Sequence, residues 1–143
     1  MLGEYFVDTN VILYAFSASD QSKRDVAQSL LIEGNPVISS QVISEFSNVS
    51  STKYKLSTAQ IINYIDDIVA KVTTVPVSFS IAKRALQIKD RYKLSFYDSQ
   101  IIAAAIASGC TTLYTEDLSN GQIINETLQI VNPFKDGENS DEK

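Results

Sequence analysis

Four carboxylates in the sequence stand beside segments whose apolar residues predict burial. Asp8 directly follows a short apolar strand, and Glu45 lies on a helix whose neighbouring residues face inward. Asp98 falls in the first turn of the most apolar helix, and Asp117 ends another strand. An unpaired carboxylate is costly beside a buried element, and crowded carboxylates repel one another unless cations hold them. The four acids are therefore candidate ligands for hard cations such as Mg²⁺ and Mn²⁺.

Each acid also has a structural explanation. Asp8 could cap the helix that follows it. Asp98 stands three residues after Ser95, the spacing of a capping box, although Asp replaces the usual Glu or Gln. Asp117 could form a turn, and Glu45 could be an exposed helix residue. The functional interpretation therefore depends on all four acids occurring together with suitable neighbours.

Two absences narrow the chemistry further. The chain has no histidine, which excludes histidine acid–base catalysis, Ser-His-Asp triads and His-ligated zinc. It has one cysteine, Cys110, which excludes an intrachain disulfide and a Cys-rich metal site. We interpret Cys110 as a buried strand residue. If the protein is an enzyme, carboxylates are its catalytic groups.

Strands and helices alternate along the chain, which predicts an α/β domain with a mainly parallel sheet of about five strands, covered by helices on both faces. In such folds ligands bind outside the carboxyl ends of the strands, where Asp8 and Asp117 are expected. Strands are predicted at residues 4–7, 36–38, 72–77, 111–115 and 129–131. Helices are predicted at residues 10–16 and 20–33, from residue 39 or 40 through 49, and at 57–70, 79–92 and 95–107.

The 143 residues fit one domain, which we place at residues 1–134, followed by a polar acidic tail at 135–143 that we expect to be disordered. No apolar run reaches the length of a membrane span. The N-terminus reaches Asp8 without the basic segment of a signal peptide. We therefore expect a cytoplasmic protein that does not enter a membrane.

The formal net charge of −5 argues weakly against a nucleic-acid partner. Within this acidic chain one basic stretch stands out. It comprises Lys83, Arg84, Lys89, Arg91 and Lys93. Its charges form either a solvated helix face or a surface that contacts phosphates.

Four motifs give the chain a family resemblance over roughly residues 4–132. They are Asp8-Thr9-Asn10, Ser44-Glu45-Phe46, residues 97–105 and residues 114–118, in that order. Together they resemble the motifs of PIN domains, and most of all those of the VapC-type ribonuclease toxins of toxin–antitoxin pairs. The resemblance implies a three-layer PIN-like fold and a metal-dependent endoribonuclease that uses Mg²⁺ or Mn²⁺ to hydrolyse RNA phosphodiester bonds. It also implies a cognate antitoxin protein as partner.

The resemblance assigns roles residue by residue. Asp8, Glu45 and Asp98 match the three principal metal-site acids, and Asp117 matches the fourth. Thr9 and Asn10 match the polar residues that support the first aspartate, and Thr115 matches a small hydroxyl residue before the last acids. Asn120 departs from the pattern, because related sequences often place an aspartate there, and Glu116 ranks below Asp117. With RNA as substrate, Lys89, Arg91 and Lys93 become candidate RNA contacts.

Two other classes of function are consistent with the same residues. One is a catalytically inactive PIN-like or other α/β binding module that keeps an acidic cation pocket. The other is a phosphoryl-transfer domain of the phosphatase or receiver type. That class usually has a second acid two residues after the strand-final aspartate, where this chain has Asn10.

The broad apolar faces of the helices at 20–33 and 57–70 also predict a homodimer.

Overall fold

The computed structural model describes residues 4–135, in which six strands and six helices alternate. The predicted tail at 135–143 lies outside the described residues except for Lys135. No helix within 4–135 is long and apolar enough to cross a membrane. The strands are β1 (Glu4–Val7), β2 (Asn35–Ser39), β3 (Thr73–Val75), β4 (Thr112–Tyr114), β5 (Ile123–Ile124) and β6 (Leu128–Val131). The helices are α1 (Thr9–Ala15), α2 (Gln21–Ile32), α3 (Ser40–Thr52), α4 (Thr58–Lys71), α5 (Phe79–Tyr92) and α6 (Phe96–Ala107).

The strands form one sheet in the order β3-β2-β1-β4-β6-β5, and every neighbouring pair except β5–β6 is parallel. The predicted α/β fold with a mainly parallel sheet is therefore confirmed. β1 lies at the centre, where Phe6 pairs with Val37 of β2 and Leu113 of β4. This register ends β1 and β4 at the same edge of the sheet, so Asp8 and Thr115 leave their strands side by side.

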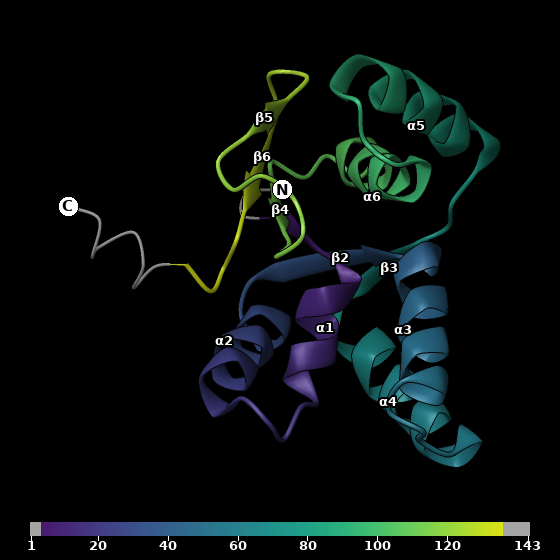
Figure 1. The fold of residues 1–143 in the computed structure, drawn as a ribbon, viewed down its shortest axis with the longest axis vertical. Coiled ribbons are helices and arrows are strands. Elements are labelled where there is room, and N and C mark those ends of the chain that lie inside the picture. The colour runs from purple at the N-terminus through teal and green to yellow at the C-terminus, as the bar shows by residue number, and fades with distance from the viewer. Residues whose placement is uncertain (1–3, 136–143) are drawn as a thin grey trace.

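Helices cover both faces of the sheet, which gives the predicted three layers. Figure 1 shows α1 to α4 on one side, and α5 packed on α6 on the other. The helix α6 is apolar nearly all round, and Ile101 to Ala105 in its middle are all buried, because it lies between the sheet and α5. The edge of the sheet that carries Asp8 faces the N-terminal ends of α1 and α3.

Local sequence signals set most of the helix boundaries. Ser57 and Gln60 form a reciprocal capping box at the start of α4. The Ser95 hydroxyl accepts a hydrogen bond from the Asp98 backbone N–H at the start of α6. Gly34 follows α2 with a positive φ of 77°, and a side chain there would meet the Tyr5 ring at 2.9 Å.

The structure differs from the predicted elements in three places. β5 has only two residues, which is too short to produce an alternating pattern, and it pairs antiparallel at the sheet edge. β3 is shorter than the predicted strand at 72–77 because only three of those residues pair with β2. Cys110 is buried as predicted but precedes β4 rather than lying in it, and burial raises the pKa of its thiol to about 12.

Candidate active site

Asp8 occupies the junction between the central strand β1 and the helix α1. It is the N-cap of α1, and its Oδ1 accepts a hydrogen bond of 2.7 Å from the Thr9 backbone N–H. Only 6% of Asp8 is exposed, so its carboxylate has little water to solvate it. Asp8 therefore caps α1, and the cap fixes its carboxylate at the carboxyl edge of the sheet, where the functional interpretation requires it.

Thr115 holds the second oxygen of this carboxylate. Its hydroxyl is fully buried at the end of β4 and donates to Asp8 Oδ2 at 2.9 Å. The Thr115 hydroxyl oxygen in turn accepts from Asn10 Nδ2 at 3.1 Å and from the Asp117 backbone N–H at 3.2 Å. A hydroxyl has one proton to donate and two lone pairs to accept with, so these three bonds use all of them. The Thr115 proton is thereby directed to Asp8.

Asn10 connects Asp117 to this cluster. Its amide nitrogen donates to Asp117 Oδ2 at 2.9 Å, and its oxygen accepts from the Glu116 backbone N–H at 3.1 Å. A single side chain from the first turn of α1 therefore holds the segment after β4. Thr9 contacts Asp8 directly, as the resemblance implies, whereas Asn10 contacts Asp117 and reaches Asp8 only through the Thr115 hydroxyl.

Glu45 approaches Asp8 from the helix α3. Its Oε1 accepts from the Thr9 hydroxyl at 2.7 Å, and its Oε2 accepts from Gln41 Nε2 at 3.0 Å. Thr9 therefore contacts two acids, Asp8 through its backbone N–H and Glu45 through its hydroxyl. Each Glu45 oxygen keeps one lone pair for a further partner.

Asp98 is the acid that the network holds least directly. Its backbone N–H donates to Ser95, but its carboxylate accepts no hydrogen bond from the residues that the structure describes. Only one half of a capping box is thus present, so helix capping does not account for the Asp98 carboxylate. The peptide before it is held, because the Tyr97 carbonyl accepts from Gln41 Nε2 at 3.1 Å.

Burial and neighbouring charge raise the pKa of Asp8 to about 7. Desolvation is the largest cause, and the negative charges of Glu45 and Asp117 add to it. The hydrogen bonds from Thr9 and Thr115 oppose the shift without cancelling it. The ionised form of Asp8 is therefore destabilised, because no positive charge within residues 4–135 lies close enough to balance it. A bound cation would stabilise that ionised form.

The negative charge of Glu116, unlike that of Asp8, is balanced by an ion pair. Its carboxylate pairs with Lys23, and its Oε1 accepts from the Tyr14 hydroxyl at 2.9 Å. This ion pair neutralises none of the four candidate acids. Asn120, the departure from the family pattern, accepts from the Asn132 backbone N–H at 2.8 Å and so braces a loop.

The candidate ligand atoms of the four acids fit a hydrated hard cation. All of them are oxygens, which suits Mg²⁺ or Mn²⁺. Among residues 4–135, no three acidic or cysteine side chains stand close enough to enclose an ion by themselves. Mg²⁺ usually keeps several waters and takes only one or two carboxylates from the protein. The arrangement therefore fits an ion that completes its shell with water.

The sequence analysis missed two buried glutamines beside the acids. Gln41 contacts both Glu45 and Tyr97, and Gln100 Nε2 donates to Gln41 Oε1 at 2.8 Å. A signal was present for each. Gln41 stands one helical turn before Glu45, and Gln100 directly precedes the apolar run of α6.

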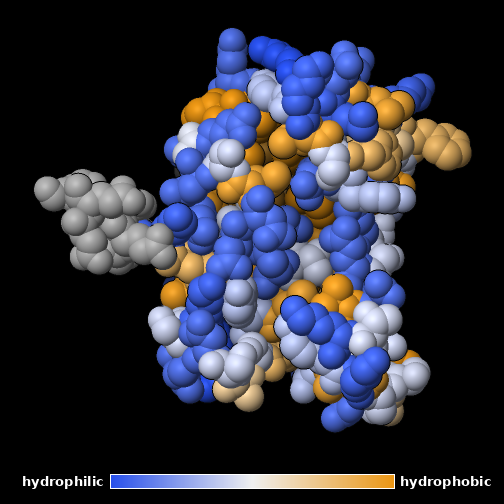
Figure 2. Space-filling view, in the orientation of Figure 1, coloured by the Kyte–Doolittle hydropathy of each residue, from blue (hydrophilic) through white to orange (hydrophobic). Residues whose placement is uncertain are grey.

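The basic residues lie along α5 and just beyond it. Lys83, Arg84, Lys89, Arg91 and Lys93 are all exposed. Over this end of the molecule Figure 2 shows hydrophobic side chains at the surface beside hydrophilic ones, and the large apolar residues exposed on α5 are Phe79 and Leu86. An exposed basic face is compatible with both interpretations made from the sequence, so the RNA contacts of Lys89, Arg91 and Lys93 stay a prediction.

The fold and this acidic edge define an α/β domain in which a buried carboxylate, that of Asp8, and other acids lie beyond the central parallel strands. Comparison with protein families identifies the domain: the PIN domain model matches residues 5–119. The chain therefore belongs to the PIN-domain family. No curated protein matches the sequence.

Solved structures share the fold at low sequence identity. The toxin VapC20 of Mycobacterium tuberculosis, which cleaves the sarcin-ricin loop, is 18% identical with a TM-score of 0.64, over 79% of this chain and 89% of that one. A toxin–antitoxin complex from Klebsiella pneumoniae gives 21% identity and a TM-score of 0.67, over 90% and 97%. DNA-bound VapBC from Salmonella typhimurium gives 16% and 0.66, over 89% and 96%.

The pKa of Asp8 predicts how the metal-free protein responds to pH. The folded pKa of about 7 lies above the ordinary value of 3.8, so between these values the folded state binds more protons than the unfolded state. The Asp8 contribution to stability is fully present below pH 4 and is lost as pH rises through 7. Wild type should therefore lose stability relative to Asp8→Asn between pH 5 and pH 8, measured by urea unfolding in EDTA. Parallel pH profiles for the two proteins would contradict the raised pKa.

Proposed function

We propose that this PIN-domain protein is a metal-dependent endoribonuclease and the toxin of a toxin–antitoxin pair. The family is one of ribonucleases that generally use divalent metals. The observation that carries the proposal is the buried Asp8 carboxylate, linked by hydrogen bonds to Glu45 through Thr9 and to Asp117 through Thr115 and Asn10. The reaction is hydrolysis of RNA phosphodiester bonds.

The proposed roles of the acids follow the family resemblance. We assign Asp8 and Asp98 as direct ligands of Mg²⁺ or Mn²⁺, and Glu45 and Asp117 as groups that ligate directly or through water, or orient the nucleophile. A bound ion supplies a more acidic water and offsets negative charge on the scissile phosphate. Thr9, Asn10 and Thr115 hold the carboxylates in place. Single-stranded or loop RNA is the expected substrate, because its backbone can bend into a cleft.

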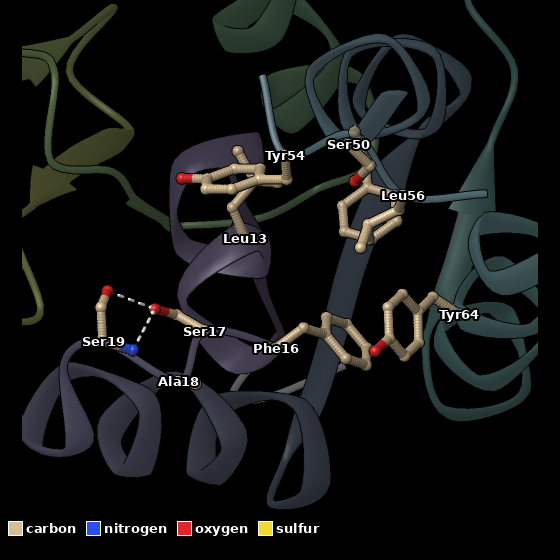
Figure 3. A pocket seen from close by; sticks show the side chains of 10 residues that line it. Leu13, Phe16, Ser17, Ala18, Ser19, Ser50, Tyr54, Leu56 and Tyr64 are labelled. Atoms are coloured by element: carbon tan, nitrogen blue, oxygen red, sulfur yellow. Dashed lines mark hydrogen bonds between the residues drawn. The ribbon is translucent and has the colours of Figure 1, made fainter. Parts of the chain in front are cut away.

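We propose that an antitoxin segment binds in an apolar groove formed by α1, α3, α4 and nearby loop residues. The groove has a volume of about 310 Å³ and is lined mainly by hydrophobic and aromatic side chains. Figure 3 shows the rings of Phe16 and Tyr64 next to each other in the lining of this groove, and their centroids are 4.5 Å apart. Such a groove suits the apolar side chains of a partner segment. The complexes with antitoxins among similar structures support this partner class.

We also propose that two copies of the chain form a homodimer in the cytoplasm. Large hydrophobic side chains are exposed on the two helices that the sequence singled out. Ile32 of α2 is 68% exposed, and Ile62 and Val69 of α4 are 52% and 41% exposed. Covering apolar surface of this kind is the main driving force for association.

Removal of one ligand charge tests the catalytic proposal. Asp98→Asn keeps the shape of the side chain and removes its charge, so turnover should fall by about a hundredfold or more. Wild type should cleave single-stranded RNA with Mg²⁺ or Mn²⁺ and lose that activity in EDTA. The control Asp66→Asn, an exposed position on α4, should keep wild-type turnover. Full activity of the wild type after exhaustive chelation, or of Asp98→Asn, would reject the assigned mechanism. A wild type that binds Mn²⁺ without cleaving RNA would favour the binding-module alternative.

Neutralisation of the basic helix tests where RNA lies. Replacing Lys89, Arg91 and Lys93 with Gln should weaken RNA binding and flatten its salt dependence, because fewer counterions are released. A matched control replaces Lys53, Lys55 and Lys71 with Gln and so removes the same charge from elsewhere. Binding titrations at several salt concentrations should show a flatter salt dependence of RNA binding for the first variant than for the control. An unchanged slope for the first variant with a reduced slope for the second would move the RNA path to the Lys53 side.

One measurement of molar mass tests both protein partners. Light scattering should give twice the chain mass for the purified protein, and a larger mass after co-expression with its cognate antitoxin. Tyr54→Asp places a charge in the groove at a half-exposed position. This variant should stay a dimer but fail to retain the antitoxin. A monomer mass across micromolar concentrations would reject the dimer, and retention of the antitoxin by Tyr54→Asp would reject the groove.

A further inference from the structure

Two buried glutamines join α3 to the start of α6 beside the candidate acids. Gln41 and Gln100 are each 8% exposed. Gln41 Nε2 donates to Glu45 Oε2 at 3.0 Å and to the Tyr97 carbonyl at 3.1 Å. Gln41 Oε1 accepts from Gln100 Nε2 at 2.8 Å. The Gln41 side chain is thus in contact with an acid of α3 and with the peptide that precedes Asp98.

The partners of Gln41 determine the orientation of its amide. The Glu45 carboxylate and the Tyr97 carbonyl can only accept, so both must face the Gln41 nitrogen, and its two N–H groups are both used. The Gln41 oxygen faces the Gln100 nitrogen, which donates. An amide turned the other way would place its oxygen against two acceptors. Gln41 therefore has one orientation in which all its groups are satisfied, and Gln100 fixes it.

Glu45 is held from two sides as a result. The Thr9 hydroxyl holds one oxygen and ties Glu45 to the Asp8 side of the site. Gln41 holds the other oxygen and ties Glu45 to the turn that carries Asp98. Within residues 4–135 the Asp98 carboxylate has no hydrogen-bond donor of its own. The position of Asp98 relative to Glu45 therefore depends on the backbone that Gln41 holds.

We infer that Gln41 is a positioning residue for the metal site: it sets the spacing between Glu45 and Asp98, and Gln100 acts through it. This inference rests on the proposed metal-dependent function. Gln41 does not touch the reacting atoms in this role. Residues that orient ligands in this way typically change metal affinity by about tenfold to a hundredfold when they are replaced. A glutamine that only filled the junction between α3 and α6 would change stability without that loss.

The test compares Gln41→Met with wild type and a matched control. Methionine keeps the length of the side chain and removes the amide. The control Gln28→Met removes an amide that donates to the Ala15 carbonyl at 2.9 Å, on the helix α2 and away from the acids. Calorimetric titration of metal-free protein with Mn²⁺ should show affinity weakened about tenfold or more for Gln41→Met, and unchanged for Gln28→Met. At saturating Mn²⁺ the KM for single-stranded RNA should stay near that of wild type while kcat falls.

A second variant, Gln100→Met, keeps the inference falsifiable if Gln41→Met does not fold. Gln100→Met removes only the donor to Gln41, so it should weaken Mn²⁺ binding in the same direction and by less. The double variant should bind Mn²⁺ no more weakly than Gln41→Met alone, because Gln100 acts through Gln41. Wild-type Mn²⁺ affinity in a folded Gln41→Met or Gln100→Met would overturn the inference and leave the proposed function intact. A wild type that binds no Mn²⁺ would overturn the proposed function itself.

Discussion

The burial of one carboxylate, that of Asp8, is the constraint on which the rest of the site depends. Desolvation disfavours its charged form and raises its pKa to about 7, even though two hydrogen bonds oppose the shift. Those bonds come from the Thr9 backbone N–H at the start of α1 and from the Thr115 hydroxyl at the end of β4. A strand, a helix and a neighbouring strand must therefore meet at one point. The parallel pairing of β1 with β4 brings them there.

From Asp8 the polar network extends in two directions. On the β4 side, Thr115 and Asn10 hold the segment that carries Asp117. On the α3 side, the Thr9 hydroxyl holds Glu45, and Glu45 is held in turn by Gln41. The supporting side chains use their hydrogen-bonding groups on acids, on the backbone next to them or on one another. The site is thus built by residues that fix carboxylates without neutralising them, an arrangement that favours a cation over an ion pair.

Within residues 4–135, Lys23 and the basic residues of α5 do not form ion pairs with the four candidate acids. Lys23 pairs with Glu116, the acid adjacent to Asp117, and lies 4.7 Å from the centre of the Tyr14 ring. The basic residues of α5 are exposed on the other side of the sheet from α1 to α4. A protein with a formal net charge of −5 can still present local positive charge to a polyanion in this way.

The sequence by itself determined the succession of strands and helices, the helix starts near Ser57 and Ser95, and the apolar character of the helix α6. These features depend on residues close together in the chain, so periodicity and capping spacing reveal them. The four acids and their order were also readable, because each follows or occupies a predicted buried element. The family motifs then indicated which polar neighbours go with them.

Only the tertiary structure decided which of these residues meet. Asn10 and Asp117 are 107 residues apart, and Thr9 and Glu45 are 36 apart. Their contacts follow from the strand order β2-β1-β4, which no local pattern specifies. The same holds for Gln41, whose role appears only when α3 lies against the start of α6. The two residues of β5 pair with β6 for a similar reason, since an edge strand that short depends on its neighbour rather than on its own sequence. Local sequence patterns indicate which residues of a segment are buried, whereas tertiary packing decides which other segments those residues contact.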